Sequence, residues 1–60
     1  MNEEEIKTLL VSLTKYSKGQ VDLLYKLHQE TEVGIIYGAN LLNWNGWDYD
    51  MVKSIILKMN

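Results

Sequence analysis

The stretch LHQETEVGIIYGANLL, residues 27–42, decides the fold. Its first residues continue an apolar helical stripe, and the segment 31–34 then interrupts that pattern. After the break, apolar residues recur at helical spacing and predict a short helix that is apolar on much of its surface. They are Ile35, Ile36, Ala39, Leu41 and Leu42. A helix of this kind needs neighbours on several sides, so we expect it at the centre of a bundle.

Gly38 lies inside this central helix. Glycine in a helix interior costs about 1 kcal/mol relative to alanine. We therefore expect a close helix crossing at Gly38 that leaves no room for a side chain.

Two more helices are expected before residue 31. Ser17 and Gln20 have the form of a capping box, which predicts a helix from residue 17 to about 30. Its apolar stripe consists of Val21, Leu24, Leu27 and His28. Asn2 can cap an earlier helix over residues 2–16, whose stripe consists of Ile6, Leu9, Leu10 and Leu13.

A fourth helix is expected at the end of the chain. Residues 43–47 indicate a turn, and Asp48 can cap the helix that follows. Its buried stripe should contain Val52, Ile55, Ile56 and Met59. The sequence thus predicts an all-α fold in a single domain, 1–60, in which 1–16 is an additional N-terminal helix and 17–60 is a three-helix bundle.

Composition limits what this domain can be. The chain has 60 residues, no cysteine and no proline, so neither disulfides nor thiolate metal sites are available. Its formal charge is −2, with lysine as its only strongly basic residue type, which is a poor composition for binding nucleic acid. No apolar run approaches the roughly 18–20 residues of a membrane span, and the acidic start differs from a secretory signal. We expect a cytoplasmic protein, and the lysine, asparagine and isoleucine usage is typical of a low-GC bacterium or its phage.

The segment 27–36 is similar to the signature that opens bacterial elongation factor Ts, in which Leu-Arg-Glu, a threonine and Gly-Ala-Gly-Met-Met follow in order. The similarity extends without a gap over residues 19–58: Leu42 falls on the family's helix-two leucine and Asp48 on the aspartate after its turn glycine. The resemblance implies a three-helix ubiquitin-associated-like (UBA-like) bundle. It also makes an elongation-factor-Tu-like GTPase one candidate partner.

The chain departs from the family at several positions. The family's first glycine is Glu32 here, its aspartate-cysteine pair is Tyr37-Gly38, and its turn glycine is displaced by one residue to Gly46. The nucleotide-exchange body that follows this domain in the family is missing. On this resemblance we expect that the chain is not a complete exchange factor.

In ubiquitin-associated domains, which have the same fold, an apolar-glycine-aromatic loop and the end of the third helix form the ligand patch. The resemblance places Val33, Gly34 and Ile35 in that loop, and Ile56 and Met59 at the helix end. In the alternative interpretation, Gly34 merely permits the turn and the isoleucines belong to the core. The additional helix has no counterpart, and it would cap the bundle, pair with another copy in a homodimer, or cover the patch.

Four aromatic residues within thirteen positions exceed what so small a core readily buries: Tyr37, Trp44, Trp47 and Tyr49. Tryptophan and tyrosine are favoured anchors of protein interfaces. We expect Trp44, which lies between two asparagines, to be exposed. Trp47 is either a second anchor or a lid folded over the core.

Catalytic and metal-binding chemistry find little support. His28 is the only histidine and is expected to pack on a helix face rather than act as a base. An EF-hand with Gly46 at its sixth position would put Leu41 and Val52 where carboxylates are required. In a helix-turn-helix, Asp48 and Asp50 would face the DNA groove. We expect no enzyme activity, no cofactor and no metal.

The sequence thus favours a non-catalytic protein-protein interaction module, such as a small phage or bacterial regulator that binds a host protein. The expected contact residues are Val33, Gly34, Ile35, Tyr37, Trp44, Trp47, Ile56 and Met59. The alternative is a nucleic-acid-associated regulator that acts as a small helical dimer.

Overall fold

The structure, a computed structural model, describes residues 2–59; Met1 and Asn60, the ends of the predicted domain, lie outside them. Four helices follow one another, and no strand occurs in residues 2–59. They are α1 (Glu3–Leu13), α2 (Lys18–Thr31), α3 (Ile35–Trp44) and α4 (Tyr49–Met59). The prediction of an all-helical chain with four helices is confirmed.

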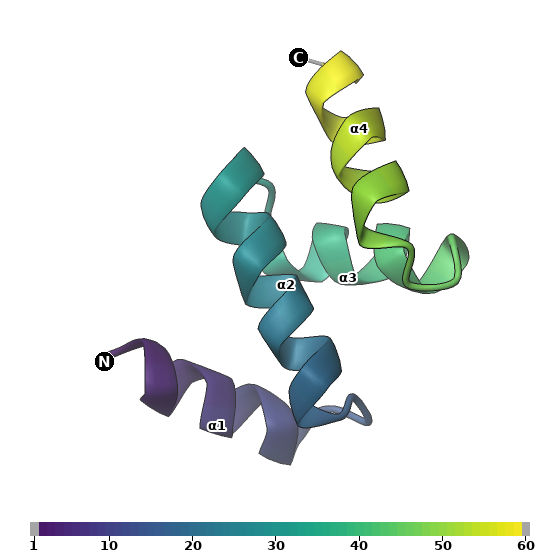
Figure 1. Cartoon of the computed structure of the whole chain (residues 1–60). Coiled ribbons are helices and arrows are strands. Elements are labelled where there is room, and N and C mark those ends of the chain that lie inside the picture. Colours follow the sequence, from purple (N-terminus) through teal and green to yellow (C-terminus); the bar gives the residue numbers. More distant parts are fainter. Residues whose placement is uncertain (1, 60) are drawn as a thin grey trace.

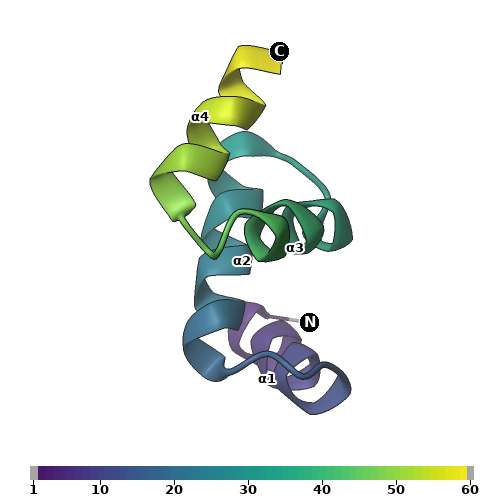
Figure 2. The ribbon, with the colours of Figure 1, turned by 90° about the vertical axis from the view of Figure 1, so that its right-hand side faces the viewer.

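α2 is the central helix of the arrangement. It packs against each of the other three helices, α3 also packs against α4, and α1 packs on α2 alone among the described helices. Figures 1 and 2 show α3 lying across α2, α4 rising beyond α3, and α1 at the opposite end of α2. No helix within residues 2–59 combines the length and apolar character that crossing a bilayer would require.

The hydrophobic core lies between α2, α3 and α4. One cluster of buried side chains contains Leu24, Leu27, Ala39, Leu42, Val52 and Ile56. Leu27, Leu42 and Val52 have no accessible surface. Tyr16 and Trp47 cover one edge of this cluster, with their ring centroids 5.1 Å apart in an edge-to-face arrangement.

The first helix differs from its prediction in length and burial. α1 ends at Leu13 rather than Tyr16, because the backbone of Thr14 is extended. The Thr14 N–H and Oγ1 both donate to the Leu10 carbonyl and so cap this end of the helix. The predicted stripe does not enter the core: Ile6 and Leu10 are half-buried, and Leu9 and Leu13 are exposed. α1 contributes no buried residue.

Polar contacts attach α1 to α2. Lys7 Nζ lies 3.2 Å from Asp22 Oδ1, and Gln29 Nε2 donates to Glu3 Oε1 at 3.1 Å. The hydrogen bonds of Lys7 to Glu3 and then Asp22 raise the pKa of the lysine above its ordinary value. Polar pairs therefore connect the two helices, while Leu9 and Leu13 of α1 remain exposed.

The predicted capping motifs are confirmed. Asn2 Oδ1 accepts from the Glu5 N–H at 2.9 Å, and Ser17 and Gln20 form a reciprocal capping box at the start of α2. Asp48 Oδ1 accepts from the Met51 N–H at 3.2 Å at the start of α4. Each cap satisfies backbone donors that have no partner within the helix.

Gly38 lies at a close crossing, as predicted. A Cβ at this position would lie 3.2 Å from Leu27 Cδ2 and 3.3 Å from Val33 Cγ1. Both distances are shorter than ordinary van der Waals contact. α3 can approach α2 and the following loop this closely because Gly38 has no side chain.

Glu32 ends α2 in a left-handed conformation, with φ 61°, that only glycine adopts without a steric cost. Glu32 is also exposed, so its side chain has little packing to lose. We expect Glu32→Gly to stabilise the protein by about 1 kcal/mol, because the backbone strain at this position is relieved. Urea denaturation checks this prediction; an unchanged or lower midpoint would contradict it.

Candidate functional site

The loop between α2 and α3 is held in one conformation by three hydrogen bonds. Thr31 Oγ1 donates to the Leu27 carbonyl at 2.7 Å and accepts from the Val33 N–H at 3.3 Å. His28 Nδ1 lies 2.7 Å from the Val33 carbonyl, an acceptor, so this nitrogen carries the proton. His28 is half-buried, as expected of a packing residue, and in addition it fixes the loop.

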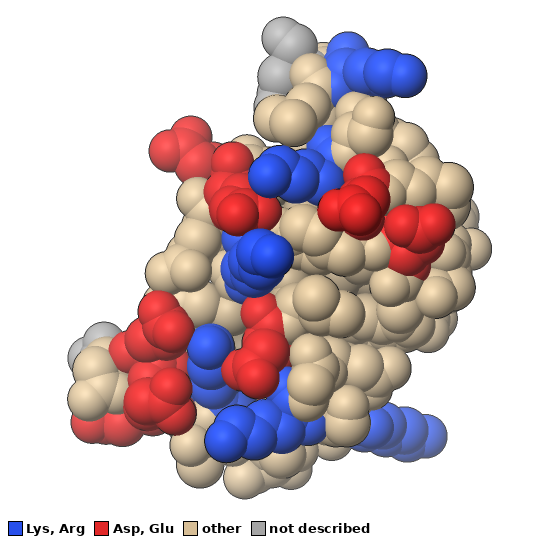
Figure 3. Space-filling view, in the orientation of Figure 1, with Lys and Arg blue, Asp and Glu red and all other residues tan. Residues whose placement is uncertain are grey.

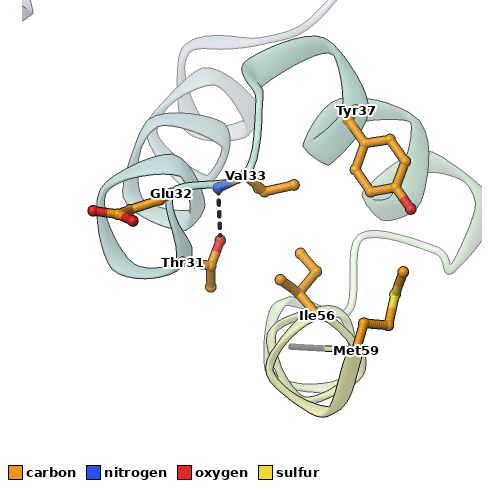
Figure 4. A pocket seen from close by; sticks show the side chains of 6 residues that line it. All are labelled: Thr31, Glu32, Val33, Tyr37, Ile56 and Met59. Carbon is orange, nitrogen blue, oxygen red and sulfur yellow. Dashed lines mark hydrogen bonds between the residues drawn. The ribbon is translucent and has the colours of Figure 1, made fainter.

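This loop forms one wall of an open hollow of about 500 Å³. The hollow is lined by Thr31, Glu32, Val33, Tyr37, Ile56 and Met59. Figure 4 shows Val33, Tyr37, Ile56 and Met59 around a shared space between the loop, α3 and the end of α4, while the Glu32 carboxylate points away from it. Val33 of the expected contact loop therefore lies around the same hollow as Ile56 and Met59, the expected contact residues of α4.

A second, smaller hollow of about 250 Å³ adjoins the first along α3. It is lined by Tyr37, Asn40, Leu41 and Trp44. Tyr37 belongs to both hollows, so they form one continuous surface. Trp44 is 84% exposed, which agrees with its prediction as an exposed residue, and Ile36 is 80% exposed on the same helix.

We call this region the α3 surface and define it by Val33, Ile36, Tyr37, Asn40, Leu41, Trp44 and Met59. α3 has the sequence IIYGANLLNW and contains no charged residue. The charged side chains gather elsewhere: Figure 3 shows lysines and acidic residues spread over the regions of α1, α2 and α4. The α3 surface is therefore an apolar and neutral part of a charged protein.

The other predicted contact residues have different positions. Ile56 is only 5% exposed and is a core residue at the floor of the larger hollow. Trp47 is half-buried and packs on the core beside Tyr16, as in the lid alternative. Ile35 is half-buried, and Gly34 is the exposed N-cap of α3.

Sequence reasoning missed Ile36, Asn40 and Leu41 as members of this surface. A spacing signal was present, because residues 36, 40 and 44, and also 37 and 41, recur every four positions and so share a helix face. The sequence does not reveal which face of this helix lies inward, since apolar residues occur on most of its circumference. Only the positions of α2 and α4 decide that.

A charged cluster lies on the side of the bundle where α2 meets α4. Glu30 accepts hydrogen bonds from the Tyr49 hydroxyl and from Lys53 Nζ, the latter at 3.1 Å, and Lys26 Nζ lies 4.9 Å from the centre of the Tyr49 ring. The bond from Tyr49, followed by that from Lys53, lowers the pKa of Glu30; burial, followed by the bond to Glu30, raises the pKa of Tyr49. This cluster joins the two helices.

The Glu30 cluster predicts a specific pH dependence. Because the pKa of Glu30 is lower in the folded chain than its ordinary value of 4.5, its contribution is present above that value and is lost as pH falls through the folded-state pKa. Glu30→Gln should therefore have a lower free energy of unfolding than wild type at neutral pH. The difference between the two proteins should shrink in acid. Urea denaturation at several pH values measures both; a deficit that is constant between neutral and acid pH would contradict the account.

No group of three or more histidine, cysteine, aspartate or glutamate side chains in residues 2–59 is arranged to hold a metal ion. Comparison of the chain with protein-family models, with curated proteins and with solved structures finds no match in any of the three.

Proposed function

We propose that this chain is a non-catalytic protein-binding module whose partner docks an apolar segment on the α3 surface. The observation that carries the proposal is the exposure of Ile36, Tyr37 and Trp44 along a helix that has no charged residue. Exposed aromatic and aliphatic side chains around hollows are the usual anchors of protein interfaces.

The shape of the α3 surface favours an elongated apolar ligand. Two hollows that share Tyr37 can take two apolar side chains of one partner segment. An amphipathic helix presents such side chains at i and i+4, or at i and i+7, along one face. We therefore propose an amphipathic helix of another protein as the docking element.

A UBA-like arrangement of α2, α3 and α4 is part of this proposal, and backbone geometry supports it. Glu32 and Trp47 stand where the elongation factor Ts family has its first glycine and its turn glycine. They are also the non-glycine residues with positive φ in the described chain, at 61° and 62°. Glycine readily adopts this conformation. This chain thus retains the backbone conformation expected at two of the family's glycine positions without the glycines.

The test is affinity capture of partners from a low-GC bacterial lysate with a tagged chain and a double variant, Ile36→Glu with Trp44→Lys. Both positions are exposed. The new glutamate lies in the first turn of α3 and the new lysine at its last residue, where the helix dipole favours a negative and a positive charge, respectively. The net charge of the chain does not change. The double variant should stay folded and lose at least about tenfold in partner affinity, as expected for removal of interface anchors.

The matched control is Met51→Glu with Leu57→Lys, which places the same two charges at exposed apolar positions of α4. Neither residue lines the hollows of the α3 surface. The control should capture the same protein as wild type. Equal capture by the α3 variant and by wild type would overturn the assigned surface.

Val33 and Ile35, two of the expected contact residues, are poor positions for a substitution that tests binding. Val33 packs against the core and approaches Gly38 closely, and Ile35 is half-buried. An aspartate at either position would disturb folding as well as binding.

A further inference from the structure

α1 has an apolar stripe that the described part of the chain covers only in part. Ile6, Leu9 and Leu13 recur at i, i+3 and i+7 and therefore share one side of the helix. Leu9 is 44% exposed and Leu13 is 79% exposed. Glu3 and Lys7 form polar contacts between α1 and α2; Ile6 is half-buried, whereas Leu9 and Leu13 remain exposed.

The charges around this stripe are distributed unevenly along the helix. Glu4 and Glu5 lie in the first turn of α1, and Lys15 and Lys18 follow its last residue. All four side chains are exposed, and none of them forms a salt bridge within residues 2–59. The first turn of α1 is therefore acidic, and the segment that follows the helix is basic.

This distribution is complementary to itself when two copies of α1 lie antiparallel. A two-fold axis beside Leu9 and Leu10 would place Ile6 of each copy opposite Leu13 of the other. The same register brings the segment with Lys15 in each copy toward the acidic first turn of α1 in the other. A two-fold interface repeats every contact twice, so both the apolar and the charged pairs are doubled.

A shallow hollow beside Leu9 fits the lysine of a second copy. It measures about 420 Å³ and is lined by Asn2, Glu4, Glu5, Thr8 and Leu9. A lysine can place its aliphatic stem against Leu9 while its ammonium group remains near the two carboxylates.

We propose that α1 is a self-association surface whose occupant is a second copy of this chain, bound antiparallel through Ile6, Leu9 and Leu13. The dimer leaves the α3 surface of each copy free, since α1 and α3 lie at different places along α2 (Figure 2). This proposal does not depend on the proposed function.

Sedimentation equilibrium of the full chain from micromolar to millimolar concentration tests the surface. Wild type should approach twice the 7.0 kDa monomer mass, and Leu9→Gln with Leu13→Gln should weaken association at least about tenfold. Leu57→Gln, at an exposed apolar position of α4, is the control and should associate like wild type. A wild type that stays monomeric, or a double variant that associates as strongly as wild type, would overturn the proposal.

A charge exchange tests the antiparallel register. Glu4→Lys with Glu5→Lys, and separately Lys15→Glu with Lys18→Glu, should each weaken self-association, whereas an equimolar mixture of the two variants should form a heterodimer. Circular dichroism of each variant verifies that α1 remains helical. Undiminished self-association of either folded variant, or a mixture that remains monomeric, would refute this register.

Discussion

Replacing Leu42 with alanine should remove about 2–5 kcal/mol from the free energy of unfolding. Leu42 has no accessible surface and lies in the cluster that joins α3 to α2 and α4. A 60-residue domain has a total stability of only about 3–9 kcal/mol. The substitution should therefore remove a large part of the total stability, which urea denaturation followed by circular dichroism will measure.

Leu57 offers the matched control, because it is a leucine of α4 that is 53% exposed. Leu57→Ala should change the free energy of unfolding by less than about 1 kcal/mol, since alanine also has the higher helix propensity. Similar losses for Leu42→Ala and Leu57→Ala would contradict the assigned core.

Gly38→Val should destabilise the protein by about 1–3 kcal/mol or more. Its Cβ alone would lie 3.2 Å from Leu27 and 3.3 Å from Val33, and the two methyl groups of valine need space that these side chains already occupy. α3 would have to move away from α2, which would also deform the larger hollow. The measurements are the urea midpoint and the near-ultraviolet circular dichroism of the two tryptophans.

Gly19→Ala is the informative comparison at a second helical glycine. A Cβ at Gly19 meets nothing closer than Ser17 Oγ at 3.9 Å, so the helix-propensity gain of up to about 1 kcal/mol should appear as added stability. If Gly38→Val were as stable as wild type, the close crossing at Gly38 would be refuted.

The features that the sequence predicted well depend on local interactions. The caps at Asn2, Ser17 and Asp48 need residues within three positions of each other, and the close approach at Gly38 follows from an otherwise unfavourable residue in a helix. Such features can be recognised without knowing where distant helices lie.

The features that the sequence predicted poorly depend on distant helices or on backbone strain. Leu9 and Leu13 have the spacing of core residues, but α1 attaches through polar groups and leaves them exposed. The left-handed residues Glu32 and Trp47 have no local signal, because their types disfavour that conformation. For Ile36 and Ile56, only the packed structure distinguishes the exposed isoleucine from the buried one.

The central claim is that a partner protein docks on the α3 surface. The most direct measurement places a photo-reactive phenylalanine derivative at position 44, or at position 57 as a control, and identifies cross-linked proteins in a low-GC bacterial lysate by mass spectrometry. Both positions are exposed, and only Trp44 belongs to the α3 surface. We predict a distinct cross-linked protein from position 44 that competes with untagged wild type and is absent from position 57. The same products from both positions, or none from position 44, would contradict the account.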